Sequence, residues 1–493
     1  MINKILKSPL FYLILIVIIA TGLRLFRLSD YFYYAHDNDL AAWMVKDIVK
    51  NGHLRLIGQE TSTAGIFIGP FFYYLMIPFF LLTNLDPIGI TYSGIILGIV
   101  TTLSFFYVFS STHNKKVAFI ATIIYATSQY LVFNDKEIVP TMFVYLWTVW
   151  YYFAIKKLLD GKKIGYIVSG ILISFIWHIN FALVLLLPLI PVAILMSGKK
   201  LNYRYILYGL LAIIPMSIPL LLFEFRHGFM QINALITSLT TTQSQVFTLS
   251  ERFNRVLELS GKNLKSLLLP GIFEGASMYA TIVGVIVLFL AIYKKIMDNK
   301  TGILIFSWIL LYMLFFTFYS KILSEYYLNG MIVAWIVVFS ILIGRLFEIN
   351  NKTKILGALL MFMVVESNLE AIYLMPINKS GYLHRKEIVR LIDEDRQKQD
   401  YPCVSVSYIT EVGNDLGYRF FFYLRDMHVG KPAGGAPVYS IVYPLSMVDK
   451  VDLEVGALGL IYPDYKKYSK GEIKKACSGE NPNLFEPMFG YTE

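Results

Sequence analysis

Long apolar segments separated by short polar ones run through this chain up to about residue 373. A helix needs about 20 apolar residues to cross the hydrocarbon core of a bilayer, and about 11 segments approach that length. They lie at 9–28, 88–111, 117–133, 138–158, 164–178, 180–197, 205–223, 277–293, 302–320, 328–347 and 354–373. The pattern predicts an α-helical polytopic membrane protein with about 11 transmembrane helices.

The apolar segment 65–83 is also long enough to span, and the distribution of positive charge decides its placement. If it lies in the outer interface, every second loop faces the cytoplasm. Those loops then hold Lys115, Lys116, Lys156, Lys157, Lys162, Lys163, Lys199, Lys200, Arg204, Lys294, Lys295, Lys300, Arg345, Lys352 and Lys354. The short outer loops hold little beyond Lys136 and Lys321. Since cytoplasmic loops are rich in Lys and Arg, we predict that 65–83 forms an interfacial helix in the outer leaflet.

The first apolar segment has two interpretations. It follows the basic stretch MINKILK, as the hydrophobic part of a secretory signal peptide would. A signal peptide would end at a cleavage site of small residues, whereas here Arg24 and Arg27 follow. We therefore interpret it as a retained first helix, which places the N-terminus in the cytoplasm of a multi-pass plasma-membrane protein.

This topology has short cytoplasmic loops and large outer elements. The outer elements are a first loop at about 29–87, a second at about 225–274, and the tail. In the tail, predicted helices at 384–398 and 414–427 alternate with predicted strands at 403–409, 438–443 and 457–462. We expect a transmembrane domain at 1–375 and a small extracytoplasmic α/β domain at 376–493. Cys403 and Cys477 form either a disulfide, which an extracytoplasmic site permits, or two free thiols.

Composition agrees with the membrane assignment. The 493 residues are 56% hydrophobic and 16% charged, whereas a soluble domain carries about 25% charged residues. The formal net charge of +10 could suggest a nucleic-acid partner. The basic residues instead cluster in short loops between apolar segments, which is typical of membrane topology. We therefore exclude nucleic acid as a partner.

Two aspartates stand just beyond the first helix, in the stretch HDND. Asp37, Asn38 and Asp39 precede LAAWMVKDIVKNG, which favours a helix ending near its glycine. Asn38 or Asp39 could therefore be a simple helix cap. Alternatively, a carboxylate at the membrane surface can act as a general base on a hydroxyl group. Paired carboxylates can also hold a divalent cation such as Mg²⁺ or Mn²⁺.

Further polar residues occur at the predicted outer ends of helices. Each has an ordinary structural explanation as a solvated, snorkelling or interfacial side chain. As functional candidates, Arg226 and His227 in FEFRHGF could bind a lipid phosphate, since Arg binds phosphate with two parallel hydrogen bonds. The remaining candidates for substrate contact are Asp135, Lys136, Glu137, His178, Lys321 and Glu325.

The order of these features resembles the GT-C membrane glycosyltransferases, specifically bacterial members related to protein mannosyltransferase family 39 and to the aminoarabinose transferases. The likeness rests on the HDND motif, the sequences NGHLRLIGQETS and GPFFYYLMIPF, Pro140 at the start of a span, FEFRHGF and a soluble outer tail. It covers most of residues 1–375. Asn38 stands where the family often has a second acid.

The resemblance implies a transfer of a monosaccharide from a polyprenyl-phosphate donor on the extracytoplasmic face, with inversion at the sugar. The family's catalytic acid maps onto Asp37, with Asp39 as a candidate partner, and its phosphate-binding basic residues map onto Arg226 and His227. The partners implied are the lipid-linked donor, membrane lipid, and a glycan, lipid or protein acceptor. The resemblance leaves open the sugar, the acceptor and any need for a metal.

Other functions fit parts of the sequence. A transporter or flippase of a lipid-linked sugar would share the helices and outer basic residues, but more often has mid-membrane charges and inverted repeats. A sugar-polymer ligase or polymerase would have the same broad architecture. A non-catalytic scaffold presenting the tail would have no need of Asp37.

Overall fold

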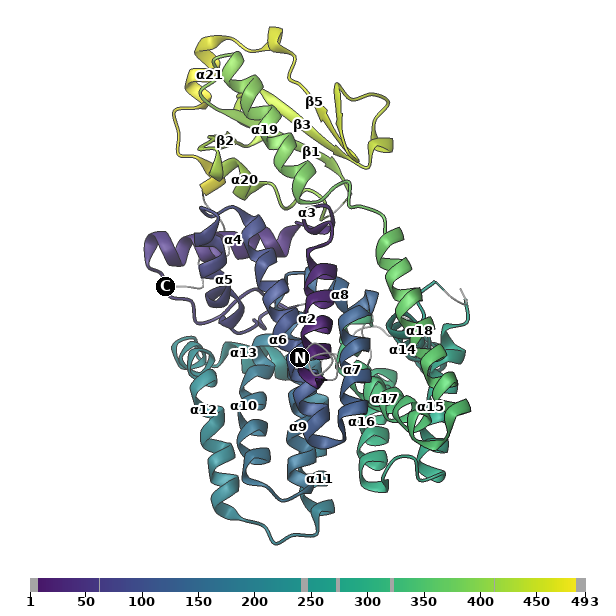
Figure 1. Ribbon diagram of the computed structural model, residues 1–493. Coiled ribbons are helices and arrows are strands. Elements are labelled where there is room, and N and C mark those ends of the chain that lie inside the picture. Colours follow the sequence, from purple (N-terminus) through teal and green to yellow (C-terminus); the bar gives the residue numbers. More distant parts are fainter. Residues whose placement is uncertain are drawn as a thin grey trace.

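The computed structural model describes residues 8–61, 63–240, 247–271, 275–319, 323–411 and 413–484. Its helices form a bundle, and the tail lies at one end of that bundle (Figure 1). The helices of the bundle are α2 Pro9–Leu25, α3 Leu28–Tyr31, α4 His36–Asn51, α5 Phe71–Leu82, α6 Thr91–Thr112, α7 Lys115–Thr127, α8 Gln129–Lys136, α9 Val144–Leu159, α10 Lys163–Ile179, α11 Leu189–Ser197, α12 Tyr203–Arg226, α13 Met230–Thr240, α14 Leu249–Leu268, α15 Ser277–Tyr293, α16 Asn299–Phe318, α17 Ile332–Ile349 and α18 Asn351–Leu374. Short 3-10 helices are η1 Pro87–Ile90, η2 Pro140–Phe143, η3 Phe181–Leu186 and η4 Glu325–Met331.

Within the described residues, five helices are long and apolar enough to cross a membrane. They are η1 with α6, α12, α16, η4 with α17, and α18. The pair α7 and α8 makes a sixth if it is one span with a bend of 58°. The polytopic helical fold is confirmed, whereas the number of about 11 spans is not, because α2, α10, η3 with α11, and α15 are apolar but shorter than 18 residues.

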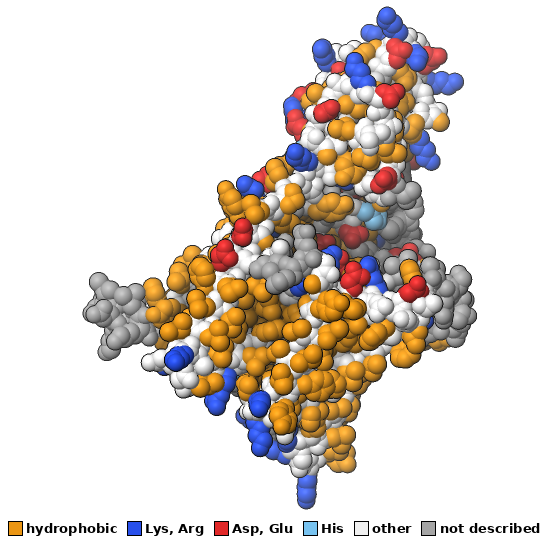
Figure 2. Space-filling model, turned by 90° about the vertical axis from the view of Figure 1, so that its right-hand side faces the viewer, with side chains coloured by type: hydrophobic (Ala, Val, Ile, Leu, Met, Phe, Trp, Pro, Cys, Tyr) orange, Lys and Arg blue, Asp and Glu red, His pale blue; other side chains and the backbone are white. Residues whose placement is uncertain are grey.

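On the face that Figure 2 shows, hydrophobic side chains cover most of the helical part. Lys and Arg gather at its tip away from the tail, and acidic side chains appear above the hydrophobic zone. α12 illustrates the lipid-facing surface, since it exposes Leu207, Leu210, Leu211, Ile214, Ile218, Leu221 and Leu222. A helix that exposes so many large apolar side chains is expected to face lipid.

The first outer loop contains α4 and α5. α4 begins at His36 with Ala35 as its cap, so the expectation that Asn38 or Asp39 caps it is wrong. Asn38 contributes from the third helical position, where its Oδ1 accepts a hydrogen bond from the Ala35 backbone nitrogen at 3.3 Å. α5 has 12 residues, a rise of about 18 Å against the roughly 30 Å hydrocarbon core. That length favours the predicted interfacial helix over a span.

The tail is a small α/β domain. Its elements are α19 Tyr382–Lys398, β1 Val404–Thr410, α20 Arg419–Leu424, β2 Val429–Gly430, η5 Pro432–Gly434, β3 Val438–Tyr443, η6 Leu445–Met447, β4 Leu453–Val455, β5 Leu458–Ile461, η7 Tyr465–Lys467, α21 Lys470–Ala476 and η8 Pro482–Leu484. The strand order is β2-β1-β3-β5-β4. β1 is parallel to β2 and β3, and β5 is antiparallel to β3 and β4. α19 lies across one face of the sheet (Figure 1).

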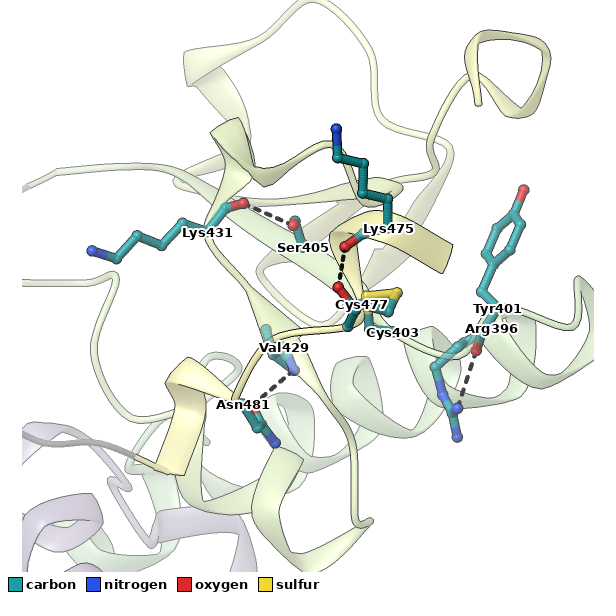
Figure 3. Close-up of a disulfide and its surroundings, with 10 residues drawn as sticks. Arg396, Tyr401, Cys403, Ser405, Val429, Lys431, Lys475, Cys477 and Asn481 are labelled. Atoms are coloured by element: carbon teal, nitrogen blue, oxygen red, sulfur yellow. Dashed lines mark hydrogen bonds between the residues drawn. A yellow bond between two sulfur atoms is a disulfide. The ribbon is translucent and has the colours of Figure 1, made fainter. Parts of the chain in front are cut away.

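Cys403 and Cys477 form a disulfide that joins the residue before β1 to the end of α21 (Figure 3). Their Cα atoms are 5.5 Å apart and the residues are separated by 74 positions. Nearby, the Val429 backbone nitrogen donates to Asn481 Oδ1 at 3.1 Å. The bond therefore ties the end of α21 to the start of β1, the strand between β2 and β3. Of the two alternatives that the sequence left open, the structure has the disulfide.

The tail is fixed to the first outer loop. Tyr382 donates through its hydroxyl to Asp86 Oδ1 at 2.6 Å, and Lys386 pairs with the same carboxylate. The Trp43 ring lies edge-on to Phe420 with centroids 5.4 Å apart. These contacts place the tail directly over α4, the helix that carries the HDND motif.

Candidate active site

Asp37 lies in the first turn of α4 and is half-buried. Among the described residues its side chain makes no hydrogen bond or ion pair. Its charge nevertheless acts on three groups from other elements: Glu137 after α8, Tyr73 of α5 and Tyr326 of η4. Asp37 is thus an accessible carboxylate where several outer segments meet, which a general base requires.

Glu137 follows directly after α8 and is exposed. The pKa of the Glu137 carboxyl is raised, chiefly because the surrounding protein keeps water from its charged form. The negative charge of Asp37 raises it further. The backbone supports this proximity, because Asn38 Nδ2 donates to the carbonyl oxygen of Ile138 at 2.7 Å. The structure therefore brings together two of the predicted site residues, Asp37 and Glu137.

Asp39 has different surroundings. It is 6% exposed, and its Oδ1 accepts hydrogen bonds from the Tyr34 hydroxyl at 2.8 Å and the Phe420 backbone nitrogen at 3.2 Å. Burial raises the pKa of the Asp39 carboxyl, although both hydrogen bonds oppose the rise. These contacts make Asp39 a link between α4 and the tail, not an open partner of Asp37.

Asp135 and Lys136 were predicted to contact substrate, but the structure buries both. Asp135 Oδ2 accepts from Arg24 Nε at 2.8 Å and from the Tyr125 hydroxyl at 2.7 Å. Lys136 Nζ donates to the Phe26 carbonyl oxygen at 2.7 Å. Asp135 is paired with side chains of α2 and α7, and Lys136 bonds to the residue that follows α2. We therefore assign both residues to the framework around the candidate site.

Arg226 and His227 lie at the outer end of α12. Arg226 is exposed and makes no hydrogen bond or ion pair among the described residues. His227 stacks on Phe223 with ring centroids 4.1 Å apart, and its Nδ1 lies 2.9 Å from the Phe223 carbonyl oxygen. Phe223 in turn packs against Phe67 of the first outer loop. This end of α12 is therefore joined to the same loop that carries Asp37.

His178 is 1% exposed and occupies a packed position. Its Nε2 lies 2.7 Å from the Met216 carbonyl oxygen, and its Nδ1 accepts from the Phe71 backbone nitrogen at 3.3 Å. Both ring nitrogens are thus engaged, and His178 joins α10, α12 and the start of α5. The structure favours a structural role over the predicted substrate contact.

The last two predicted contacts, Lys321 and Glu325, precede α17 in the sequence. Glu325 begins η4 and forms an ion pair with Lys262 of α14. Lys321 lies outside the described residues. The next residue of η4 is Tyr326, on which the charge of Asp37 acts. Glu325 is therefore next to the candidate site in the chain, although its side chain is paired with Lys262.

Sequence reasoning missed Arg55, which lies in the first outer loop after α4. It is 2% exposed, and its Nη2 is 2.7 Å from Asp47 Oδ2. The Tyr73 phenol is subject to the charges of both Arg55 and Asp37. The available clue was Asp47 on the apolar face of α4, since a buried carboxylate needs a cationic partner.

The described residues contain no group of three or more His, Cys, Asp or Glu side chains that could hold a metal ion. Asp37 and Glu137 are two carboxylates in mutual electrostatic range. Mg²⁺ is commonly held by one or two carboxylates together with substrate phosphates. The sequence paired Asp37 with Asp39 for such a cation, whereas in the structure Asp39 is buried and Glu137 is the carboxylate on which the charge of Asp37 acts.

Comparison with known proteins identifies the fold. No protein-family model and no curated protein matches this sequence. Among solved structures, ArnT from Cupriavidus metallidurans bound to undecaprenyl phosphate superposes with a TM-score of 0.59 and 10% identity over 92% of this chain and 98% of that one. Its apo structure gives a TM-score of 0.55 with 11% identity over the same shares.

A second relative in fold is the apo oligosaccharyltransferase of Archaeoglobus fulgidus, with a TM-score of 0.51 and 12% identity. The match covers 86% of this chain but only 65% of that longer one. The same oligosaccharyltransferase with Zn and sulfate gives a TM-score of 0.50. Because the superpositions with ArnT include nearly the whole of both chains, this protein has the fold of the GT-C membrane glycosyltransferases.

Proposed function

We propose that this protein is a membrane glycosyltransferase that moves a monosaccharide from a polyprenyl-phosphate donor to an acceptor hydroxyl on the extracytoplasmic face. The observation that carries the proposal is the state of Asp37. It is a half-buried carboxylate without a hydrogen-bond partner among the described residues, at a point where α4, α5, η4 and the segment after α8 meet. The fold adds support, since ArnT in the same fold binds undecaprenyl phosphate.

The chemistry follows from what the donor needs. A sugar attached through phosphate already has a good leaving group, so the acceptor is the partner that requires activation. Asp37 would take the proton of the acceptor hydroxyl while that oxygen bonds to the anomeric carbon. The bond from the anomeric carbon to the phosphate oxygen breaks, and its electron pair leaves with polyprenyl phosphate. A single displacement inverts the sugar.

The departing phosphate carries negative charge that cations would stabilise. Arg226 suits this role, because no described partner holds its guanidinium and it lies at the outer end of an α12 that faces lipid. His227 stacks on Phe223 next to it. A divalent cation held by Asp37 and Glu137 would supply further positive charge to the phosphate.

The experiment uses the purified full chain with a panel of polyprenyl-phosphate monosaccharides and candidate acceptors, and measures release of polyprenyl phosphate. Asp37→Asn should lower kcat by about 10²- to 10⁴-fold, the usual contribution of a general base. The matched control is Asp30→Asn, which alters another half-buried carboxylate of the first outer loop with no side-chain hydrogen bond among the described residues. That control should keep wild-type release.

Two results would contradict the proposal. Unchanged release by Asp37→Asn would remove the base role from Asp37 while keeping the transferase. Tight binding of every donor without release, in the presence of acceptors, would argue against the transferase and in favour of a transporter of the lipid-linked sugar.

A further inference from the structure

The segment from Asp135 to Ile138 is held at three of its four residues. Asp135 forms an ion pair with Arg24 at 2.6 Å. The Lys136 ammonium donates to the Phe26 carbonyl oxygen, and the Ile138 carbonyl oxygen accepts from Asn38. Glu137 is the one charged residue of the segment whose side chain makes no described hydrogen bond or ion pair, and it is the only exposed residue of the four.

The ion pair is built deeply into the helical bundle. The side chains of Arg24 and Asp135 are each 1% exposed. A further Arg24 nitrogen, Nη1, donates to the carbonyl oxygens of Ala20 at 3.0 Å and Ala126 at 3.2 Å. Ala126 belongs to the last turn of α7, just before the bend to α8. Arg24 therefore binds both sides of this bend, since it pairs with Asp135 of α8 and with a carbonyl group that ends α7.

Two glycines one turn apart on α6 make room for this arrangement. A Cβ atom on Gly98 would lie 2.1 Å from Arg24 Nε. A Cβ atom on Gly94 would lie 2.0 Å from the Asp135 carbonyl oxygen. Any larger residue would push the pair away from α6, so α6, α2 and α8 are shaped around one fixed position of Asp135.

Asn38 holds the other end of the segment from Asp135 to Ile138. It lies between Asp37 and Asp39 in the first turn of α4, and its Nδ2 donates to Ile138. A carboxylate at this position could not make the bond, because an ionised Asp or Glu only accepts hydrogen bonds. The hydrogen bond to Ile138 therefore explains why an amide, and not a second acid, stands at position 38.

We propose that Asn38, together with the Arg24–Asp135 pair, is a positioning device that holds Glu137 beside Asp37. This inference rests on the proposed function, in which Asp37 is the base and Glu137 helps to hold a divalent cation. The support acts from both ends of one short segment: Arg24 fixes the residue before Lys136, and Asn38 fixes the residue after Glu137. Asn38 is a positioning residue, since it bonds backbone and not substrate.

The test is a double-mutant cycle on the full chain, with kcat and KM taken from polyprenyl-phosphate release. Asn38→Ala should lower kcat about 10-fold, within the range that a small misplacement of a catalytic group produces, and leave KM for the donor unchanged. In a Glu137→Gln background the same substitution should change kcat less than about twofold. Groups that act through one another are non-additive in this way, whereas independent sites are additive.

The control is Thr281→Val, which removes a buried hydrogen bond from Thr281 Oγ1 to the Leu257 carbonyl oxygen, 2.8 Å long, between α15 and α14. Its effect on kcat should be the same in the wild-type and the Glu137→Gln backgrounds. Additive effects of Asn38→Ala and Glu137→Gln would overturn the proposal, because Asn38 would then act on stability alone.

A second measurement does not depend on turnover. Backbone hydrogen exchange in lipid nanodiscs should accelerate at residues 137–139 in Asn38→Ala and stay unchanged there in Thr281→Val. Unchanged exchange in Asn38→Ala would overturn the positioning role even if the enzyme is active. Wild-type protein that binds donors and never releases polyprenyl phosphate would contradict the proposed function, and the exchange result would still decide the positioning role.

Discussion

At the scale of single residues, Asp37 and Asp39 show how one helical turn separates two carboxylates. Residues two apart on an α-helix project in nearly opposite directions, since each residue advances by about 100°. Asp37 therefore points to the candidate site, where its negative charge acts on Glu137 and Tyr73. Asp39 points to the tail and accepts hydrogen bonds from Tyr34 and Phe420. Only one of the two aspartates in HDND is open to a substrate.

We predict that Asp39→Asn keeps the fold and the activity, whereas Asp39→Ala destabilises the docked tail by about 1–3 kcal/mol, the cost of leaving a buried donor unpaired. Asparagine retains an oxygen that can accept from Phe420. The measurement is thermal unfolding of the purified variants together with polyprenyl-phosphate release. Loss of activity in Asp39→Asn with an unchanged unfolding temperature would instead assign Asp39 a direct catalytic role.

The same residue makes a prediction about pH. A carboxyl whose pKa is raised by folding disfavours its ionised form in the folded state. Below the pKa of this carboxyl in the unfolded state, the shift makes no contribution to the free energy of unfolding. As the pH rises from that pKa toward the raised pKa of the folded state, the shift lowers the free energy of unfolding. Asp39→Asn should remove this loss, so its stability relative to wild type should rise with pH across that window. A difference between the two proteins that stays constant with pH would contradict this assignment.

Candidate residues could be named from the sequence where the argument needed no partner from a distant part of the chain. Asp37 was named as a candidate base from its place beyond the first helix, and its role stays a prediction. The roles of Asp135 and Asp39 were not found, because their partners Arg24 and Phe420 lie 111 and 381 positions away. Arg55 was passed over for a related reason, since a single Arg in a loop has no visible partner until the loop folds back onto Asp47.

At the scale of elements, the contact of α6 with α2 and α8 fixes the position of Asp135, two residues before Glu137. Charged side chains in the membrane interior are costly unless they are paired, and the Arg24–Asp135 pair is almost wholly buried. Helices come close at small residues, and Gly94 and Gly98 provide them here. The bend between α7 and α8 then directs Glu137 toward α4.

We predict that Gly98→Ala lowers stability by about 3–5 kcal/mol, the usual cost of breaking a buried ion pair, because the new methyl group would displace Arg24 from Asp135. Gly22→Ala on α2 is the matched control, since a Cβ there meets nothing within 4 Å. Unfolding temperature and the monodisperse yield in detergent report the effect. Equal behaviour of the two variants would show that Arg24 can move without loss of the pair.

The first helix and three strands of the tail were predicted to within about two residues, whereas the predicted helix 414–427 is only α20 and the short strands β2 and β4 were not predicted. The helices of the membrane part were predicted less well in length. Strands and helices of the tail alternate with polar turns, so composition marks their ends. In the bundle, apolar residues continue through the bends. The predicted span 117–133 is interrupted at Ser128 between α7 and α8, and the predicted span 138–158 begins as η2. Hydropathy reports burial in lipid, and it does not report where the backbone turns.

At the scale of the whole molecule, the tail is joined to the bundle through the first outer loop and is closed by its own disulfide. The bond between Cys403 and Cys477 encloses a separation of 74 residues. A loop of that length predicts a stabilisation of about 4 kcal/mol. Replacing both cysteines with serine should therefore make the tail sensitive to protease while the transmembrane fragment stays intact. Proteolysis that is unchanged without the bond would mean that docking on α4 alone holds the tail folded.

The orientation of the molecule is a further prediction, because Lys and Arg gather at the end of the bundle opposite the tail (Figure 2). Cytoplasmic loops are the ones rich in these residues, so the tail, Asp37 and Glu137 should face outward. Alkaline phosphatase fused after residue 484 should be active, and the same enzyme fused at Asn350, beside Arg345, Lys352 and Lys354, should be inactive. Green fluorescent protein should show the reverse at both sites. If phosphatase is active only at Asn350, the candidate site faces the cytoplasm, and the acceptor must be sought there, in a compartment where the disulfide would not persist.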